Sequence, residues 1–105
     1  MRLNPHAGHL YFLLLGRAYL FLGDLEQARI NLDEAVARNP LNLETHVYMA
    51  VLHVAAGDKT AAAWEADEIR ALRPGFTSRD WMDTYPMVDA GQKSRLAQAL
   101  GELGF

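Results

Sequence analysis

The sequence has no cysteine, so it can form no disulfide framework and no thiolate metal site, and it offers no thiol nucleophile. It also has no long apolar run. The most apolar stretch, Leu10 to Leu22, contains Gly16 and Arg17 and is shorter than the ~20 residues that a membrane-spanning helix needs. The pattern of a signal peptide is missing as well. We therefore expect a soluble protein, by default cytoplasmic, with no membrane partner.

An excess of positive charge is missing too. The chain has 10 Lys and Arg against 13 Asp and Glu, a formal net charge of -3, and its cations are scattered along the sequence. This distribution argues against nucleic acid as a partner. Apolar residues make up 50% of the 105 residues, as in ordinary globular proteins. We expect a single folded domain over 1–105, with a thin core.

Motifs of catalysis are likewise absent. There is no Walker loop, no G-x-G-x-x-G, no HExxH and no G-x-S-x-G. The adjacent or near-adjacent carboxylates are expected on solvated helix faces, where nothing shifts their pKa values for acid–base work. These carboxylates are Asp33, Glu34, Asp67, Glu68, Asp80 and Asp83. The sequence predicts no catalytic residue and no cofactor, and therefore no enzyme activity within this chain.

The four histidines, His6, His9, His46 and His53, raise the question of a metal site. His46 and His53 are seven residues apart, whereas two ligands on one turn of a helix are four apart. His6 and His9 are three apart, which suits adventitious metal only. We expect His46 and His53 to be hydrogen-bonded packing residues, and we predict no metal site.

An internal repeat is the strongest feature of the sequence. Three landmarks recur at one constant interval: Gly23-Asp24 with Gly57-Asp58, Ala28 with Ala62, and Pro40 with Pro74. Three landmarks in one register predict two structural units, 9–42 and 43–76. The interval, about 34 residues, is typical of a helix-turn-helix repeat.

The first unit resembles the tetratricopeptide repeat family at eight positions, which are Phe12, Leu15, Gly16, Tyr19, Ala28, Leu32, Ala35 and Pro40. The second unit keeps Ala62 and Pro74 and has His46, Met49, Ala50, His53, Ala66 and Ile69 at the other six. The resemblance implies an all-α fold in which antiparallel helix hairpins stack as a short right-handed solenoid. We expect helices at about 8–22, 25–38, 43–56 and 59–72.

Local chemistry supports these helix limits. Gly23 supplies a left-handed residue that ends the first helix, and Asp24 caps the next helix with Gln27 completing a capping box. The small residues Gly16 and Ala28 are expected to face each other across the first hairpin, where enlarging Ala28 would cost roughly 1 to 3 kcal/mol.

The repeat register ends after Pro74, because Pro86 would fall inside a third first helix. For 77–105 we expect a short helix after Ser78 and a last helix after Asp89, which forms a capping box with Gln92. Leu96, Ala99, Leu100 and Leu103 share one face of that last helix, which should cap the end of the solenoid.

This tail, with Pro-Gly-Phe-Thr-Ser, Trp81 and Pro86, also resembles the C-terminal repeat region of bacterial regulators that carry an adenylate cyclase or DNA-binding domain. That resemblance implies an alternative function as the regulatory or sensor segment of such a protein. Met1 to Pro5 reads like the end of a preceding second helix, as Leu72-Arg73-Pro74 does. Since stacked repeats generally number three or more, we expect either a fragment or a self-associating protein.

The first helix carries a second apolar stripe, and the resemblance implies that it lines a concave groove. The predicted groove residues are Leu10, Leu13, Leu14, Arg17, Leu20, Phe21, Val47, Tyr48, Val51 and Val54. Such a groove would bind another protein or peptide through an apolar helix or an extended segment. The alternatives are that the stripe packs on a preceding repeat, on a second copy in a homodimer, or on Phe76, Trp81 and Tyr85.

The carboxylate clamp of some relatives, which holds the acidic C-terminus of a chaperone, needs basic or amide side chains at set groove positions. The matching residues here are Leu13, Arg17 and Tyr48. Only Arg17 is basic, so we do not expect a chaperone tail as partner.

Overall fold

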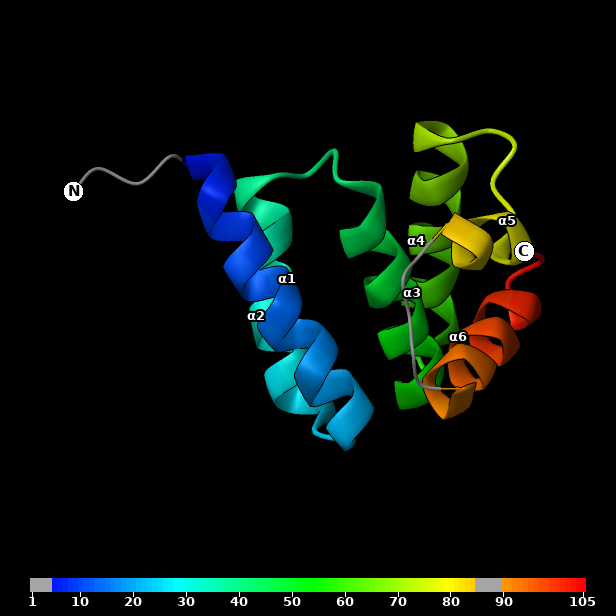
Figure 1. Cartoon of the computed structure of the whole chain (residues 1–105), viewed down its shortest axis with the longest axis horizontal. Helices are drawn as coiled ribbons and strands as arrows, with labels where there is room; N and C mark the ends of the chain where they lie inside the picture. Colours follow the sequence, from blue (N-terminus) through cyan, green and yellow to red (C-terminus); the bar gives the residue numbers. More distant parts are fainter. Residues whose placement is uncertain (1–4, 85–89) are drawn as a thin grey trace.

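The computed structural model describes residues 5–84 and 90–105, and the regular secondary structure of these residues is entirely helical. The helices are α1 (Pro5–Leu22), α2 (Leu25–Arg38), α3 (Leu43–Ala56), α4 (Lys59–Leu72), α5 (Ser78–Thr84) and α6 (Ala90–Glu102). Figure 1 shows α1 and α2 as one antiparallel hairpin beside a second hairpin, α3 and α4, with α5 and α6 next to the second. The predicted all-α fold of stacked helical hairpins is confirmed.

The turn between α1 and α2 is set by two residues. Gly23 has a φ of +85°, a left-handed conformation that L side chains rarely adopt. The N–H of Asp24 donates to Tyr19 O at 3.0 Å, and the Asp24 carboxylate accepts from Gln27 N at 3.2 Å. The predicted capping box is therefore only half formed, because the backbone carbonyl of Tyr19 takes the N–H that the Gln27 side chain would have bound.

The same turn recurs one repeat later. Gly57 has a φ of +77°, Asp58 N donates to His53 O at 2.9 Å, and the Asp58 carboxylate caps Ala61 N. The two turns have the same geometry and lie one repeat apart. The predicted helices at 25–38, 43–56 and 59–72 are confirmed, with the first and last residues that were predicted.

The start of α1 differs from the prediction. Pro5 is the first residue of α1, three residues before the expected start. Proline suits a first helical position because no carbonyl of the helix needs its missing N–H. Residues 1–4 lie outside the described part of the chain.

The two helices of the first hairpin approach each other closely at Gly16, but the residue that faces Gly16 is not the predicted one. A Cβ at Gly16 would lie 2.6 Å from Leu32 Cγ, so Gly16 faces Leu32 and not Ala28. The helices run antiparallel from the turn at Gly23, so a residue seven positions before the turn lies opposite one about as far beyond it. Ala28 is fully buried nearer the turn.

Helix α3 is the centre of the molecule. It contacts α1, α2, α4 and α6, and every residue from 45 to 52 is buried. Its sequence is apolar on nearly all sides, as expected for a helix that is enclosed by its neighbours.

The tail packs back onto the second hairpin. Trp81 of α5 is 4% exposed and meets Tyr48 of α3 edge to face, with ring centroids 5.9 Å apart. Leu96, Ala99 and Leu100 of α6 are buried, and α6 contacts α3. The predicted short helix after Ser78 and the predicted last helix are confirmed. Asp89, and with it the predicted capping box, lies outside the described residues.

The end of the chain is held at the base of α5. Ser78 donates to Phe105 O from both its backbone N and its Oγ, each at 3.1 Å. Arg70 of α4 donates to Leu103 O at 2.7 Å, and its guanidinium lies over the Phe105 ring. These contacts fix α6 relative to α4 and α5.

Candidate functional site

The predicted groove residues separate into covered and open positions. Leu13, Leu20, Val47, Tyr48 and Val51 are buried, Arg17, Phe21 and Val54 are half-buried, and Leu10 and Leu14 are 54% and 52% exposed. Half of the set is therefore buried in the folded chain. Sequence reasoning could not say which half, because the position of the tail depends on tertiary packing.

Among the predicted groove residues, Tyr48 is covered by the tail. Its ring lies edge to face with Phe21 of α1 on one side, at 6.4 Å, and with Trp81 of α5 on the other. Trp81 therefore packs on one of the predicted groove residues, Tyr48, whereas packing of the first-helix stripe on Phe76, Trp81 and Tyr85 stays a prediction. Phe76 packs beside Trp81, with ring centroids 6.4 Å apart, whereas Tyr85 lies outside the described residues.

What stays open on this side is a cleft of about 230 Å³ between α1, α3 and α6. Its apolar lining comes from Leu20 and Phe21 of α1, Val51, Val54 and Ala55 of α3, and Ala99 of α6, and its polar rim from Arg95, Gln98 and Glu102 of α6. Four predicted groove residues meet here. We call this the α6 cleft.

Arg95 joins the two walls of the α6 cleft. Its guanidinium donates to Phe21 O at 3.3 Å and lies 5.8 Å from the centroid of the Phe21 ring. Phe21 is in the last turn of α1, where the helix dipole favours a cation. Arg95 therefore fixes the width of the cleft at its α1 end.

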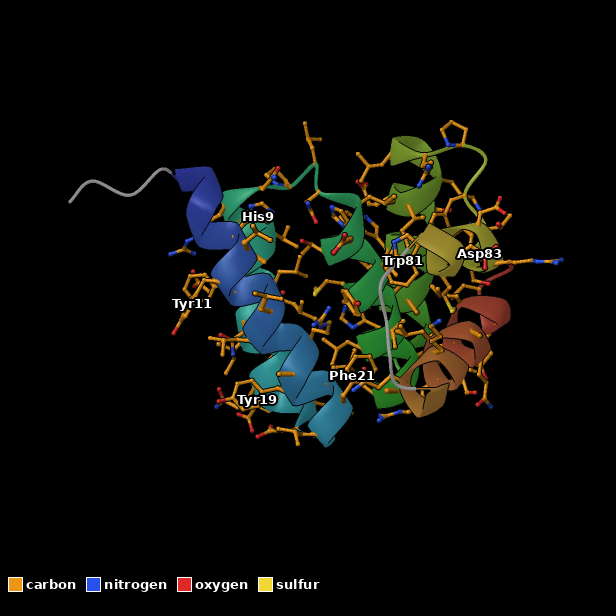
Figure 2. The ribbon with its side chains drawn as sticks, viewed as in Figure 1. His9, Tyr11, Tyr19, Phe21, Trp81 and Asp83 are labelled. Atoms are coloured by element: carbon orange, nitrogen blue, oxygen red, sulfur yellow. The ribbon has the colours of Figure 1, made fainter. Side chains whose placement is uncertain are left out.

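The second open surface is the outer face of α1, formed by Tyr11, Leu14, Ala18 and Leu22. Tyr11 is 63%, Leu14 52% and Leu22 78% exposed, and Figure 2 shows Tyr11 pointing away from the rest of the molecule. A hollow of about 440 Å³ lies on this face, lined by Leu14, Arg17, Ala18, Phe21 and Leu22 with Gln92 of α6. The outer face itself carries no charge.

Arg17 of α1 lines the hollow on the outer face of this helix. Burial raises the pKa of the Glu44 carboxyl, and the positive charges of Arg17 and then His9 act against that rise. The guanidinium of Arg17 is therefore near enough to Glu44 to interact with it across the hairpin boundary. This charge is the single cation among the predicted groove residues.

His46 is a hydrogen-bonded packing residue, as the sequence predicted. Its Nδ1 lies 2.6 Å from Glu65 Oε2 and its Nε2 2.6 Å from Pro40 O. Both side chains are almost fully buried. A carbonyl oxygen only accepts, so Nε2 carries a proton, and Nδ1 and the Glu65 carboxylate share another. The hydrogen bond that the imidazole makes to the Glu65 carboxylate raises the pKa of His46, against the opposing effect of burial.

Glu65 is the functional group that sequence reasoning missed. The signal was present, because Ala62, Glu65, Ala66 and Ile69 fall at helical spacing on one face of α4, and all four are buried. A carboxylate on such an inner face needs a partner, and His46 on the facing helix supplies it.

The other carboxylates lie on the surface, as predicted. Asp33, Glu34, Asp67, Asp80 and Asp83 are exposed and Glu68 is half-buried. The expectation that nothing shifts their pKa values is wrong for Asp33, because burial raises the pKa of this carboxyl against the opposing charges of Arg29 and His53. Over residues 5–84 and 90–105, no three His, Asp or Glu side chains form a group that could hold a metal ion. In that same part of the chain, no helix combines the length and apolarity needed to cross a membrane.

Comparison with known proteins gives one family match. The model of the tetratricopeptide repeat matches residues 10–52, which run from α1 through α2 into α3. No curated protein matches the chain significantly, and no solved structure does either. The matched segment contains every predicted groove residue except Val54.

Proposed function

Since residues 10–52 of this chain belong to the tetratricopeptide repeat family, whose repeats generally mediate contacts between proteins, we propose that the chain is a protein-interaction module. The proposed binding site is the α6 cleft. The proposal assigns the chain no reaction of its own, in keeping with the typically non-catalytic role of the family.

The observation that carries the proposal is the chemistry of the α6 cleft. Leu20, Val51 and Val54 give it an apolar floor, and a volume of about 230 Å³ suits one or two large side chains better than a whole helix. Interfaces draw most of their affinity from a few such anchors in well-packed pockets. We therefore expect a partner that inserts an apolar anchor side chain, such as leucine or phenylalanine.

The rim of the α6 cleft gives the partner an orientation. Arg95 and Gln98 offer donors, and Glu102 offers an acceptor, all from one side of α6. A main-chain carbonyl or a carboxylate next to the anchor can bind Arg95, and an N–H can bind Glu102. Polar groups around an apolar pocket are the usual means by which interfaces fix the direction of a bound segment.

The test compares tryptophan substitutions at two exposed alanines. Ala55→Trp places a large ring in the mouth of the α6 cleft, whereas Ala63→Trp adds the same ring to the surface of α4, away from it. A phage library of random dodecapeptides is selected on the wild-type chain, and the affinity of the enriched peptides is measured for both variants.

We expect enriched peptides with a large apolar residue that bind the wild-type chain and Ala63→Trp alike and bind Ala55→Trp about tenfold or more weakly. Peptides that bind Ala55→Trp as well as the wild type would place the binding site elsewhere. A library that yields no specific peptide would refute the cleft as an interaction site.

A further inference from the structure

We propose that His46 is a proton-sensitive latch on the link between the two hairpins, residues 39–42, and that loss of one proton releases this link and changes the width of the α6 cleft. The inference rests on the proposed function, because it assigns a regulation to the same cleft. The regulating ligand is the proton, so the chain would bind its partner in a way that depends on pH.

The first argument is a count of protons and acceptors. Nε2 of His46 donates to Pro40 O, and Nδ1 faces the Glu65 carboxylate, so two shared protons serve two oxygens. When the pair loses one proton, a single N–H remains. It stays on Nδ1, because a carboxylate binds a donor about twice as strongly as a neutral carbonyl does. Nε2 then turns a lone pair toward Pro40 O, and the link loses this bond to α3.

The second argument is a comparison of the two repeats. Phe12 and Asn31 stand one repeat before His46 and Glu65. Phe12 is an apolar ring, and the Asn31 amide donates within its own helix, so neither side chain titrates. A buried ion pair is often no more stabilising than apolar groups of similar volume. The second repeat therefore carries a titratable pair that this packing position does not require.

The link and the α6 cleft lie at opposite ends of α3. Pro40 precedes the first turn of α3, whereas Val54 and Ala55 of its last turn line the cleft together with Phe21 of α1. Figure 1 shows the link at one end of the hairpins and the end of α1 at the other. Helix α3 has 14 residues and is therefore about 20 Å long. A rotation of about 5° at the link displaces the far end of α3 by about 2 Å.

The charges around His46 set the direction of the switch. The bond to the Glu65 carboxylate raises the pKa of His46 most, against burial, and Glu68 adds to the rise. The link is therefore held below the folded pKa and released as the pH rises through it. The other charged groups that act on this pair, on its neighbours or on the first turn of α3 are Asp33 and Arg29 of α2, Glu44 and His53 of α3, and Arg17 and His9 of α1.

The experiment measures the width of the α6 cleft over a pH series. Leu22→Cys and Ala97→Cys place one spin label at the end of α1 and one on α6, both at exposed positions, and the natural chain has no cysteine. Pulsed double electron resonance gives the distance between the labels from about pH 5 to about pH 9. The NMR signals of the imidazole carbons give the titration of His46 over the same series.

Two variants separate the latch from other effects of pH. His46→Phe combined with Glu65→Asn gives the second repeat the pair of the first, so this link has no proton to lose. Glu65→Gln holds the link closed at neutral and alkaline pH. A neutral imidazole then accepts from the Gln amide at Nδ1 and still donates to Pro40 O from Nε2.

We expect the distance to change by about 2 Å with the native pair, at the pH at which His46 titrates, and to stay constant in both variants. Peptides selected for the cleft should bind about tenfold more weakly above that pH. A constant distance with the native pair would overturn the proposal, and so would a change that persists in both variants because His9 or His53 causes it. A library with no cleft peptide would refute the proposed function and leave the distance to decide on the latch.

Discussion

The imidazole of His46 bridges the carboxylate of Glu65 and the carbonyl of Pro40, with each ring nitrogen 2.6 Å from its oxygen. One buried side chain thereby ties α3 to α4 and both to the segment that enters from α2. The contact requires protons on the imidazole, so the cohesion of the second hairpin depends on pH.

Stability should fall as the pH rises above neutrality. The pKa of His46 is raised in the folded protein by the Glu65 hydrogen bond first, with the Pro40 carbonyl and the charges of Glu65 and Glu68 adding to it against burial. Its contribution is fully present below the unfolded pKa of about 6.5 and is lost as the pH rises through the folded value. Urea unfolding at a series of pH values from about 5 to about 9 measures this slope.

Glu65→Gln is the matched control for that slope. It keeps the shape of the side chain and removes the charge, and breaking a buried pair in this way costs about 3 kcal/mol. We expect the decline above neutral pH to become shallower in the variant. An unchanged slope in Glu65→Gln would mean that another group causes the pH dependence.

Gly16→Ala should destabilise the first hairpin. The added Cβ would lie 2.6 Å from Cγ of the fully buried Leu32, so one helix must shift, at a cost of roughly 1 to 3 kcal/mol. Gly101→Ala is the control, since a Cβ there meets nothing within 4 Å and alanine favours a helix by about 0.5 to 1 kcal/mol. Thermal unfolding of both variants should show shifts of opposite sign.

The two tryptophans should differ sharply on truncation. Trp81 is 4% exposed and contacts Tyr48 and Phe76, so Trp81→Ala should cost about 3 to 5 kcal/mol. Trp64 is 58% exposed on α4, so Trp64→Ala should change stability by no more than about 0.5 kcal/mol. Equal losses in chemical denaturation would show that α5 does not anchor the tail through Trp81.

The repeat made most of the fold predictable. Glycine and aspartate recur together, once in each repeat, because each pair builds the same turn, and this located α2, α3 and α4. The start of α1 was missed because Pro5 was compared with Pro74, which follows a helix. Proline is also tolerated in the first turn of a helix, and this is the position that Pro5 has. Gly16 was paired with the other small residue, whereas the antiparallel geometry pairs it with Leu32.

The sequence predicted which residues form the second apolar stripe, but not which of them stay exposed. Apolar periodicity identified Leu10, Leu14 and Phe21 as members of a second stripe, and it gave equal weight to Leu13 and Val47, which the folded chain buries. The difference lies in contacts between distant segments, which a local pattern does not contain. The groove as a partner site, the homodimer, the cytoplasmic location and the alternative as a segment of a bacterial cyclase or transcription regulator stay predictions.

A stack of repeats in which each unit touches only its neighbours can unfold stepwise from either end. Arg95 changes that here, because its bond to Phe21 O joins residues 74 positions apart and returns the last helix to the first hairpin. Fraying of α6 therefore removes a contact of α1, and fraying of α1 removes one of α6. This hydrogen bond links the last helix to the first hairpin, so the helices should melt together in a single cooperative transition.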